Sequence, residues 1–301
     1  MNNTYKIFVL FVWISLLTMS CQQGNPASKD KADKSTARII TMSGFLTELI
    51  YELGHAEDLV GRDGTSTYPK ALVDSLPNLG HATKLNVEAV LQLKPSLIFV
   101  EDDQEKKIEV LQQIKDAGIE VVIVPTSTHL NNAVKAAKVV QPYLKIEDTK
   151  ISEMAKTIER DSMALATHLA TIDKKPNVLF IYARGAGRLM VAGKNTSASS
   201  IIKIAGGKNA ISSFEDFKPL TPEALIEAAP DVILMFKSGL ASLDGKKGLE
   251  QITGIPQTPA FQNDRIVTMD GHYLLSFGPR VGKAVTELAN QIHTTGKSPT
   301  L

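Results

Sequence analysis

The feature that most limits how this chain can fold is a run of 33 residues, 143–175, that contains neither glycine nor proline. Within it apolar residues recur at helical spacing, and charged side chains occupy many of the other positions; the apolar residues are Ile151, Met154, Ile158, Leu165 and Leu169. This periodicity predicts one long amphipathic helix. At about 1.5 Å per residue, 25 to 30 residues would span roughly 40 Å, the width of a domain. Such a helix could join two lobes as a stiff strut, although a surface helix packed on one lobe would show the same periodicity.

Short apolar runs alternate with helical patterns on both sides of this helix. In the first half, apolar runs at 37–42, 59–63, 96–100 and 119–125 are separated by segments with helical periodicity, one of them at 105–118. Alternating strands and helices predict a parallel sheet that is covered by helices. The alternation resumes after residue 176. The predicted fold class is therefore α/β, with two Rossmann-like lobes, one long rigid connecting helix and a ligand cleft between the lobes.

An internal repeat supports the prediction of two similar lobes. The segment LNVEAVLQLKPSLIFV (85–100) aligns with LTPEALIEAAPDVILM (220–235) at a constant offset of 135 residues. Glu88 aligns with Glu223, and the order of cap, acid, apolar helix, proline and apolar strand is the same in both segments. A repeated order of this kind is typical of a duplicated structural unit.

The first residues are interpreted as a targeting signal and a tether. An apolar run from Ile7 to Leu17 follows Lys6 and leads to Cys21, the one cysteine in the chain. The run is about half of the roughly 20 residues that a membrane-spanning helix requires. The position of Cys21 resembles the lipobox of bacterial lipoproteins, where the cysteine is lipidated, although Thr18 stands where leucine is usual. An ordinary cleaved signal is the alternative.

Composition and motifs favour a binding protein over an enzyme. The formal net charge is +1 and both signs are interspersed, so neither nucleic acid nor an acidic membrane surface is the expected partner. Signatures of nucleotide binding, zinc hydrolysis and acyl transfer are missing, and the six histidines are scattered singly. A metal-dependent envelope hydrolase would need a cluster of acids and histidines. The predicted organisation is signal peptide 1–21, tether 22–36, N-terminal lobe 37–142, connecting helix 143–175 and C-terminal lobe 176–301.

Three segments in particular carry a resemblance to a known family. They are GRDGTSTYP (61–69), MVAGKNTSASSIIKIAGGKNAI (190–211) and MDGHYLLSFGPR (269–280). They resemble the substrate-binding proteins of bacterial haem ABC importers, whose two-lobe class also includes cobalamin and ferric-siderophore binders. The lobe pattern specifies only that class, whereas the TSTYP loop with the glycine segments and GPR points to haem.

The resemblance implies a periplasmic protein that captures haem and delivers it to an ABC transporter. Haem would be its transported ligand, and the permease and the ATPase subunits of the transporter would be its protein partners. The protein is expected to be a monomer that is attached to a bacterial envelope membrane only through the lipid on Cys21. The alternative is the same fold with a ferric siderophore or cobalamin as its ligand.

The same resemblance implies a role for the tyrosine in the TSTYP loop. In the haem family this tyrosine ligates the iron, which makes Tyr68 the expected axial ligand. A phenolate is a hard anionic oxygen that favours ferric iron, and a nearby cation lowers its pKa from about 10. Lys70 stands where relatives can carry arginine, and it could bond the phenolate or a haem propionate. Without the family, Tyr68 would be taken for an ordinary turn tyrosine.

Other contacts follow less directly from the resemblance. Arg184 stands where some relatives carry a histidine ligand, so a second, stacked haem is not expected. Arg184 and Arg188 are candidates for a propionate contact, with solvated loop arginines as the alternative. His81 and His272 are candidates for supporting positions beside the haem, and Arg280 is interpreted as structural.

Glu88 and Glu223 are candidates for docking to the permease. In this transporter class one carboxylate on each lobe meets arginines of the membrane permease. Both acids are expected near the start of a helix, after Asn86 and Thr221 as predicted caps. Acids are also favoured there because they complement the helix dipole by about 0.3 to 1 kcal/mol, which is the alternative explanation.

Overall fold

The computed structural model describes residues 37–106 and 108–294, so the predicted signal peptide, Cys21 and the tether lie outside the described residues. The described chain has two sheets, one in each predicted lobe. None of the helices in the described part of the chain is long and apolar enough to span a membrane.

The sheet of the N-terminal lobe is parallel, as the alternating pattern predicts, with strand order β2-β1-β3-β4. In β3 four of five side chains are buried, which is usual for a parallel strand with helices on both faces. The strands are β1 (Ile39–Thr41), β2 (Leu59–Arg62), β3 (Leu97–Glu101) and β4 (Glu120–Val124). The helices are α2 (Gly44–Glu52), α3 (Lys70–Ser75), α4 (Val87–Gln92), α5 (Asp102–Glu105), α6 (Leu111–Asp116) and α7 (Asn132–Leu144), with 3-10 turns η1 (Ala56–Asp58) and η2 (Ala82–Lys84).

The sheet of the C-terminal lobe is mixed, with order β10-β9-β5-β6-β8 and β7 paired to β5. The strands β5, β7, β8, β9 and β10 run in one direction in it, and β6 runs antiparallel to both of its neighbours, β5 and β8. The strands are β5 (Asn177–Ala183), β6 (Leu189–Ala192), β7 (Lys208–Asn209), β8 (Phe217–Pro219), β9 (Val232–Phe236) and β10 (Ile266–Met269). The helices are α9 (Ser197–Ile204), α10 (Pro222–Ala228), α11 (Lys237–Ala241), α12 (Lys246–Glu250), α13 (Pro259–Gln262), α14 (Gly271–Leu275) and α15 (Val281–His293).

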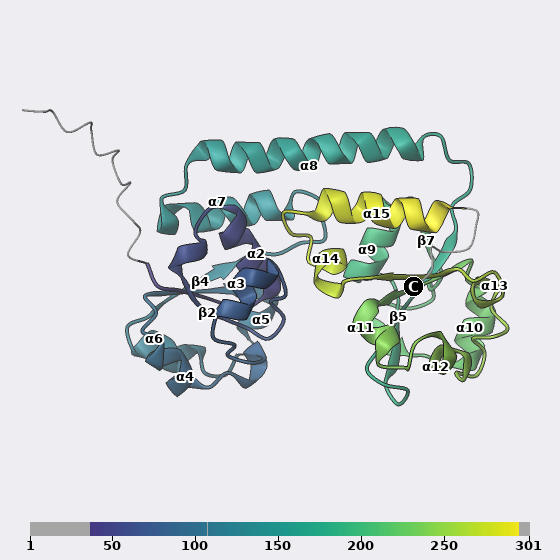
Figure 1. The fold of residues 1–301 in the computed structure, drawn as a ribbon, viewed down its shortest axis with the longest axis horizontal. Coiled ribbons are helices and arrows are strands. Elements are labelled where there is room, and N and C mark those ends of the chain that lie inside the picture. Colours follow the sequence, from purple (N-terminus) through teal and green to yellow (C-terminus); the bar gives the residue numbers. More distant parts are fainter. Residues whose placement is uncertain (1–36, 107, 295–301) are drawn as a thin grey trace, which may run out of the picture. The chain divides into compact units, whose positions relative to one another are not determined.

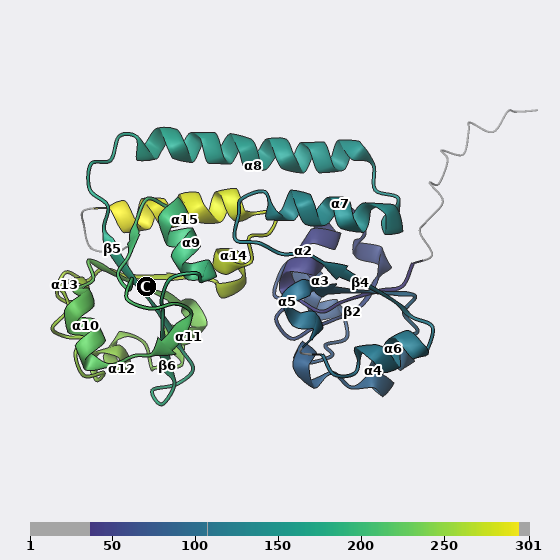
Figure 2. The ribbon, with the colours of Figure 1, turned by 180° about the vertical axis from the view of Figure 1, so that it is seen from behind.

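The long helix of the Gly- and Pro-free run is α8 (Asp148–Leu169), which has 22 residues. Its buried side chains are Ile151, Ile158 and Leu165, three of the five that define the sequence period, and the other two, Met154 and Leu169, are partly buried against the same core. Figures 1 and 2 show α8 running along α7 of one lobe and α15 of the other. The run itself holds more than one helix, because residues 143 and 144 end α7 and Lys145 turns the chain at φ 51°.

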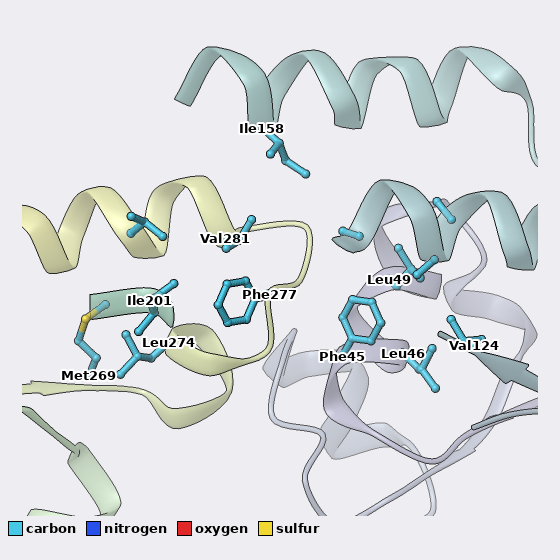
Figure 3. Close-up of a cluster of buried hydrophobic side chains, with 14 of the residues drawn as sticks. Phe45, Leu46, Leu49, Val124, Ile158, Ile201, Met269, Leu274, Phe277 and Val281 are labelled. Carbon is cyan, nitrogen blue, oxygen red and sulfur yellow. The ribbon is translucent and has the colours of Figure 1, made fainter. Parts of the chain in front are cut away.

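A shared apolar core joins α8 to both lobes (Figure 3). Ile158 of α8 lies above the junction, where Phe45 of α2 and Phe277 of the C-terminal lobe lie on facing sides. Close helix packing supports the same junction, since a Cβ at Gly282 of α15 would lie 2.6 Å from the Cβ of Asp161 in α8. The lobes are therefore linked by packed side chains as well as by the chain.

The repeat predicted from sequence is present in the structure. Strands β3 and β9 begin at 97 and 232 and end at 101 and 236, so both bounds differ by 135 residues. The residues after the preceding helices, Lys94 and Ala229, both have positive φ, 47° and 34°. Secondary structure and backbone conformation thus repeat at the spacing that the sequence alignment gives.

Candidate functional site

A cleft of about 910 Å³ lies between the lobes and is lined by residues of both. Much of the lining carries hydroxyl groups, among them Ser43, Thr65 and Thr67 from the N-terminal lobe. The C-terminal lobe adds serines and the aromatic residues Tyr182 and Phe236. A cleft of this size falls within the range of sites that enclose drug-sized ligands, about 300 to 1,000 Å³.

The loop of residues 63–69 is held by a buried carboxylate. Asp63, 1% exposed, accepts hydrogen bonds from the backbone N–H and the hydroxyl of Thr65, at 3.0 and 2.7 Å. It also accepts one from the hydroxyl of Ser66 at 2.8 Å. Ser66 in turn shares a hydrogen bond of 2.7 Å with the hydroxyl of Thr47 in α2. Because buried polar groups that are fully paired hold one conformation, the loop is fixed to the lobe before any ligand binds.

Tyr68 directly follows Thr67, which lines the cleft, and its ring contacts two other side chains. The guanidinium carbon of Arg280 lies 3.5 Å from the ring centroid, within cation–π range. Tyr51 meets the ring edge-on, with 6.2 Å between centroids. Burial raises the pKa of the Tyr68 phenol above its ordinary value of 10, and the Arg280 charge offsets part of that rise. The free protein therefore carries Tyr68 as a neutral phenol at neutral pH.

Arg280 is held over Tyr68 by a buried acid from the opposite lobe. Glu48 of α2 is 1% exposed, and Arg280 donates to both of its oxygens, Nε to Oε1 at 2.9 Å and Nη2 to Oε2 at 2.7 Å. The Nε2 atom of His272 in α14 lies 2.8 Å from Oε2. Burial raises the pKa of Glu48, but the hydrogen bonds from His272 and Arg280 outweigh it, so the pKa is lowered overall. We name these three residues the interlobe clasp.

Gly44 leaves the space that His272 occupies beside Glu48. A Cβ on Gly44 would lie 2.9 Å from Nδ1 of His272 and 2.8 Å from the carbonyl oxygen of Thr65. Such distances are too short for any side chain, so glycine allows α2 to begin against both the loop and the opposite lobe. His272 thus lines the cleft and bonds Glu48 at once.

Glu101, at the end of β3, is an ionisable group of the cleft that the sequence did not indicate. Burial raises its pKa from about 4.5 to about 7, an effect that a hydrogen bond to Ser43 opposes and that Asp103 and Asp63 increase. Near neutral pH the Glu101 carboxyl can therefore be protonated, and donate a hydrogen bond, or ionised, and carry a negative charge.

The C-terminal wall of the cleft combines rings with a cation. Tyr182 of β5 and Phe236 at the end of β9 pack at right angles, 5.8 Å between centroids. The guanidinium carbon of Arg184 lies 5.4 Å from the Tyr182 ring. Among the described residues that line the cleft, Arg184 is the one arginine or lysine. This wall can pack against a flat apolar ligand and pair with an anionic group on it.

Of the predicted site residues, Arg184 and His272 line the cleft. Tyr68 is not among the lining residues but directly follows one of them, Thr67, and three other predicted residues lie away from the lining. Lys70 is exposed and pairs with Asp74 in its own helix at 2.8 Å. His81 is an exposed cap of η2, its Nδ1 2.9 Å from the hydroxyl of Thr83. Arg188 is exposed and lies directly before β6.

Two residues beside Tyr68 and the cleft, Arg280 and Glu48, were not predicted as site residues, although the sequence contains a signal for each. Arg280 ends the FGPR segment, interpreted from sequence as structural only. Glu48 follows Phe45 by three residues and so shares its buried helix face. An acid on an apolar helix face indicates a buried charge that needs a partner, but the sequence did not identify Arg280 as that partner.

The docking candidates occupy equivalent places on the two lobes. Glu88 lies in the first turn of α4 and Glu223 in the first turn of α10, and both are exposed. The predicted caps are confirmed, since the side chains of Asn86 and Thr221 accept hydrogen bonds from the third residue after each, both at 3.2 Å.

The arrangement of two lobes, one connecting helix and a cleft matches a known family. Residues 39–273 match the periplasmic binding protein family. The chain belongs to that family. It is also 26% identical over 264 residues, 86% of this chain and 81% of the relative, to an uncharacterized ABC transporter substrate-binding lipoprotein of Bacillus subtilis. This periplasmic binding protein is therefore the extracytoplasmic substrate-binding component of an ABC transporter and not an enzyme.

Solved structures and curated relatives differ in the ligands that their names give. The periplasmic heme-binding protein RhuT from Roseiflexus, in apo form, is 36% identical, with TM-score 0.80 and coverage of 85% of this chain and 98% of that one. BhuT in complex with two hemes is 33% identical, with TM-score 0.78 and the same coverage. A cobalamin-binding protein of Halobacterium salinarum is 23% identical over 274 residues, 87% of this chain and 71% of the relative.

Within the described residues, no three His, Cys, Asp or Glu side chains are grouped closely enough to hold a metal ion. The predictions of family, fold class and transporter role are confirmed by these comparisons. The ligand and the roles of individual residues stay predictions.

Proposed function

We propose that this periplasmic binding protein captures ferric haem in the interlobe cleft and delivers it to the permease of an ABC importer. Tyr68 would be the axial ligand of the iron. The observation that carries this proposal is the placement of Tyr68, on a preformed loop directly after the cleft-lining Thr67, with the guanidinium carbon of Arg280 3.5 Å from its ring centroid. The high identity to two heme-binding proteins, 36% and 33%, supports the same ligand.

The chemistry of the loop suits ferric iron. A phenol must lose its proton to become a strong ligand, and burial makes that loss harder for Tyr68. Arg280 favours the anion, because a fixed positive charge stabilises a phenolate more than a phenol. Binding of haem is therefore expected to release the phenol proton at neutral pH. The rest of the cleft would hold the porphyrin, with Tyr182 and Phe236 against its face and Arg184 for a propionate.

Cobalamin is the second candidate ligand. Curated relatives that are named cobalamin-binding or vitamin B12-binding proteins match most of this chain at 21 to 24% identity. The aromatic wall of Tyr182 and Phe236 would also suit a corrin ring. In that case Tyr68 would line the entrance and would not be a metal ligand.

A spectroscopic titration separates these ligands. The purified protein is titrated with hemin and, separately, with cyanocobalamin, beside Tyr68→Phe and the neighbouring control Tyr51→Phe. We expect saturable hemin binding with a high-spin tyrosinate spectrum in the wild type and in Tyr51→Phe. Tyr68→Phe keeps the ring under Arg280 but lacks the oxygen, so its hemin affinity should fall by at least about tenfold, or 1.4 kcal/mol.

Other results of that titration would change the proposal in different ways. Unchanged hemin binding and spectrum in Tyr68→Phe would keep haem as the ligand and remove Tyr68 from the iron. Saturable cyanocobalamin binding with no hemin binding would replace haem by cobalamin.

Delivery would use the two exposed acids. Glu88 and Glu223 would meet cations of the permease, one on each lobe. Lipidation of Cys21, outside the described residues, would keep the protein at the membrane that holds the permease. The named lipoprotein relative of Bacillus subtilis supports that anchor.

A further inference from the structure

Exposed aliphatic side chains mark one equivalent position on each lobe. Among the leucines, isoleucines and valines of the described residues, two are exposed, Leu91 at 39% and Ile226 at 70%. Positions 91 and 226 differ by 135, the offset of the internal repeat. A single exposed aliphatic residue needs no explanation. A pair that is exposed at repeat-related positions, while the other leucines, isoleucines and valines of the described residues are buried or half-buried, indicates a shared use.

Each of these side chains follows a docking candidate by three residues. Leu91 comes after Glu88 on α4, and Ile226 comes after Glu223 on α10. Residues three apart are neighbours on a helix surface, so each lobe presents a carboxylate beside an aliphatic group. Both helices begin from a side-chain cap, and a residue with positive φ follows each of them, Lys94 after α4 and Ala229 after α10, so the two pairs are presented by similar local backbones.

The surroundings of Ile226 leave room for a partner. Ile226 borders a surface groove of about 380 Å³, which is also lined by Pro222, Gly254 and Pro256. In Figures 1 and 2, α4 and α10 lie on the parts of their lobes that face away from α8. Both pairs therefore lie on the side of the molecule that the connecting helix does not cover.

We propose that Glu88 with Leu91, and Glu223 with Ile226, form a two-part docking surface for the permease of the ABC transporter. This inference rests on the proposed role of the two acids in delivery. Two similar acid and aliphatic pairs fit a partner with two equivalent halves, each offering a cation next to an apolar pocket. The acids orient the encounter through their charge, and the aliphatic groups add apolar area that is removed from water when the surfaces meet.

The test measures binding to the transporter directly, so that it does not depend on the ligand. The cognate permease and ATPase complex in nanodiscs is titrated with wild-type protein, Leu91→Ser, Ile226→Ser and the double variant. Met163→Ser is the matched control, because Met163 is 64% exposed and lies on α8. Glu88→Gln with Glu223→Gln tests the acids separately. Circular dichroism and thermal unfolding check that every variant is folded.

We expect each aliphatic variant to weaken binding to the transporter about five- to twentyfold and the double variant to weaken it further. Met163→Ser should bind as the wild type does, and the hemin titration should be unchanged in all of them. Unchanged binding in the aliphatic double variant, with loss in the acid double variant, would overturn this inference and leave docking by the acids intact. Unchanged binding in both double variants would overturn docking by α4 and α10 altogether.

Discussion

At the scale of single residues, Glu101 gives the cleft a dependence on pH. Burial raises its pKa from about 4.5 to about 7, so the folded protein resists its ionisation while the unfolded chain does not. Stability from this group is therefore complete below about pH 4.5 and is lost as pH rises through 7. Glu101→Gln removes the cost of ionising a buried carboxyl in the folded state. We expect this variant to be more stable than the wild type at pH 8 by roughly 1 to 3 kcal/mol.

Urea unfolding at pH 4 and pH 8 measures this effect. The gain should vanish at pH 4, where both states of the wild type are protonated. Glu120→Gln, at an exposed position of the neighbouring strand β4, serves as the control and should change little at either pH. Equal stability of Glu101→Gln and wild type at pH 8 would contradict the raised pKa.

Residue identities at the site were predictable only where a motif or a repeat marked them. The TSTYP loop singled out Tyr68, and the 135-residue offset singled out Glu88 and Glu223. The partners of Glu48 were not predictable, because His272 and Arg280 are 224 and 232 residues away in the chain. Lys70 is near Tyr68 in sequence, yet helix geometry directs it to Asp74. Charge at the Tyr68 ring comes instead from the opposite lobe.

At the scale of elements, the caps of α4 and α10 should contribute similar amounts to stability. The side chains of Asn86 and Thr221 each accept one N–H that the first turn would otherwise leave unpaired. We expect Asn86→Ala and Thr221→Ala to lower the free energy of unfolding by about 1 kcal/mol each. The two positions are far apart in sequence and lie in different lobes, so the double variant should show the sum of the two losses.

Urea unfolding of the two single variants and the double variant checks this prediction. Thr253→Ala, at an exposed position outside the helices, is a suitable control. A loss of unfolding free energy in only one of the two single variants would mean that the caps share their geometry but not their contribution to stability. Loss of hemin binding in either variant would contradict a purely local role for the caps.

Helices and strands with strong periodicity could be predicted from the sequence, but interruptions of a helix within a periodic segment could not. Every apolar run of the first lobe forms a strand, and the period of Ile151, Ile158 and Leu165 gives α8. The helix expected over 105–118 is wrong in its first part, because α6 starts at residue 111. There Ile108 is buried in the second core of the lobe, at 3% exposure. Burial of that side chain overrides helical propensity, which is a tertiary effect that periodicity does not contain.

At the scale of the whole molecule, two connections set how the lobes meet. One is α8 with the apolar core around Ile158, Phe45 and Phe277. The other is the interlobe clasp, in which Glu48 of one lobe holds His272 and Arg280 of the other. Since Arg280 also stacks on Tyr68, the same contact couples lobe position to the proposed iron ligand.

Glu48→Gln tests the clasp with little change of volume. It leaves Arg280 without its carboxylate in a partly buried place, and we expect a loss of about 2 to 4 kcal/mol in the free energy of unfolding at pH 7. The folded pKa of Glu48 is lowered, so this stabilisation is present above about pH 4.5 and is lost as pH falls through the lower folded value. The difference between wild type and variant should therefore narrow between pH 5 and pH 3.

The matched control is Glu153→Gln, the same substitution at an exposed position of α8. Urea unfolding at pH 7, 5, 4 and 3 gives the free energies, and small-angle X-ray scattering at pH 7 reports the separation of the lobes. We expect Glu48→Gln, but not Glu153→Gln, to be more open and to bind hemin more weakly, because Arg280 is no longer held over Tyr68. A stability difference that stays constant from pH 7 to pH 3 would show that the charge of Glu48 does not hold the lobes together, and the α8 core would then be their main connection.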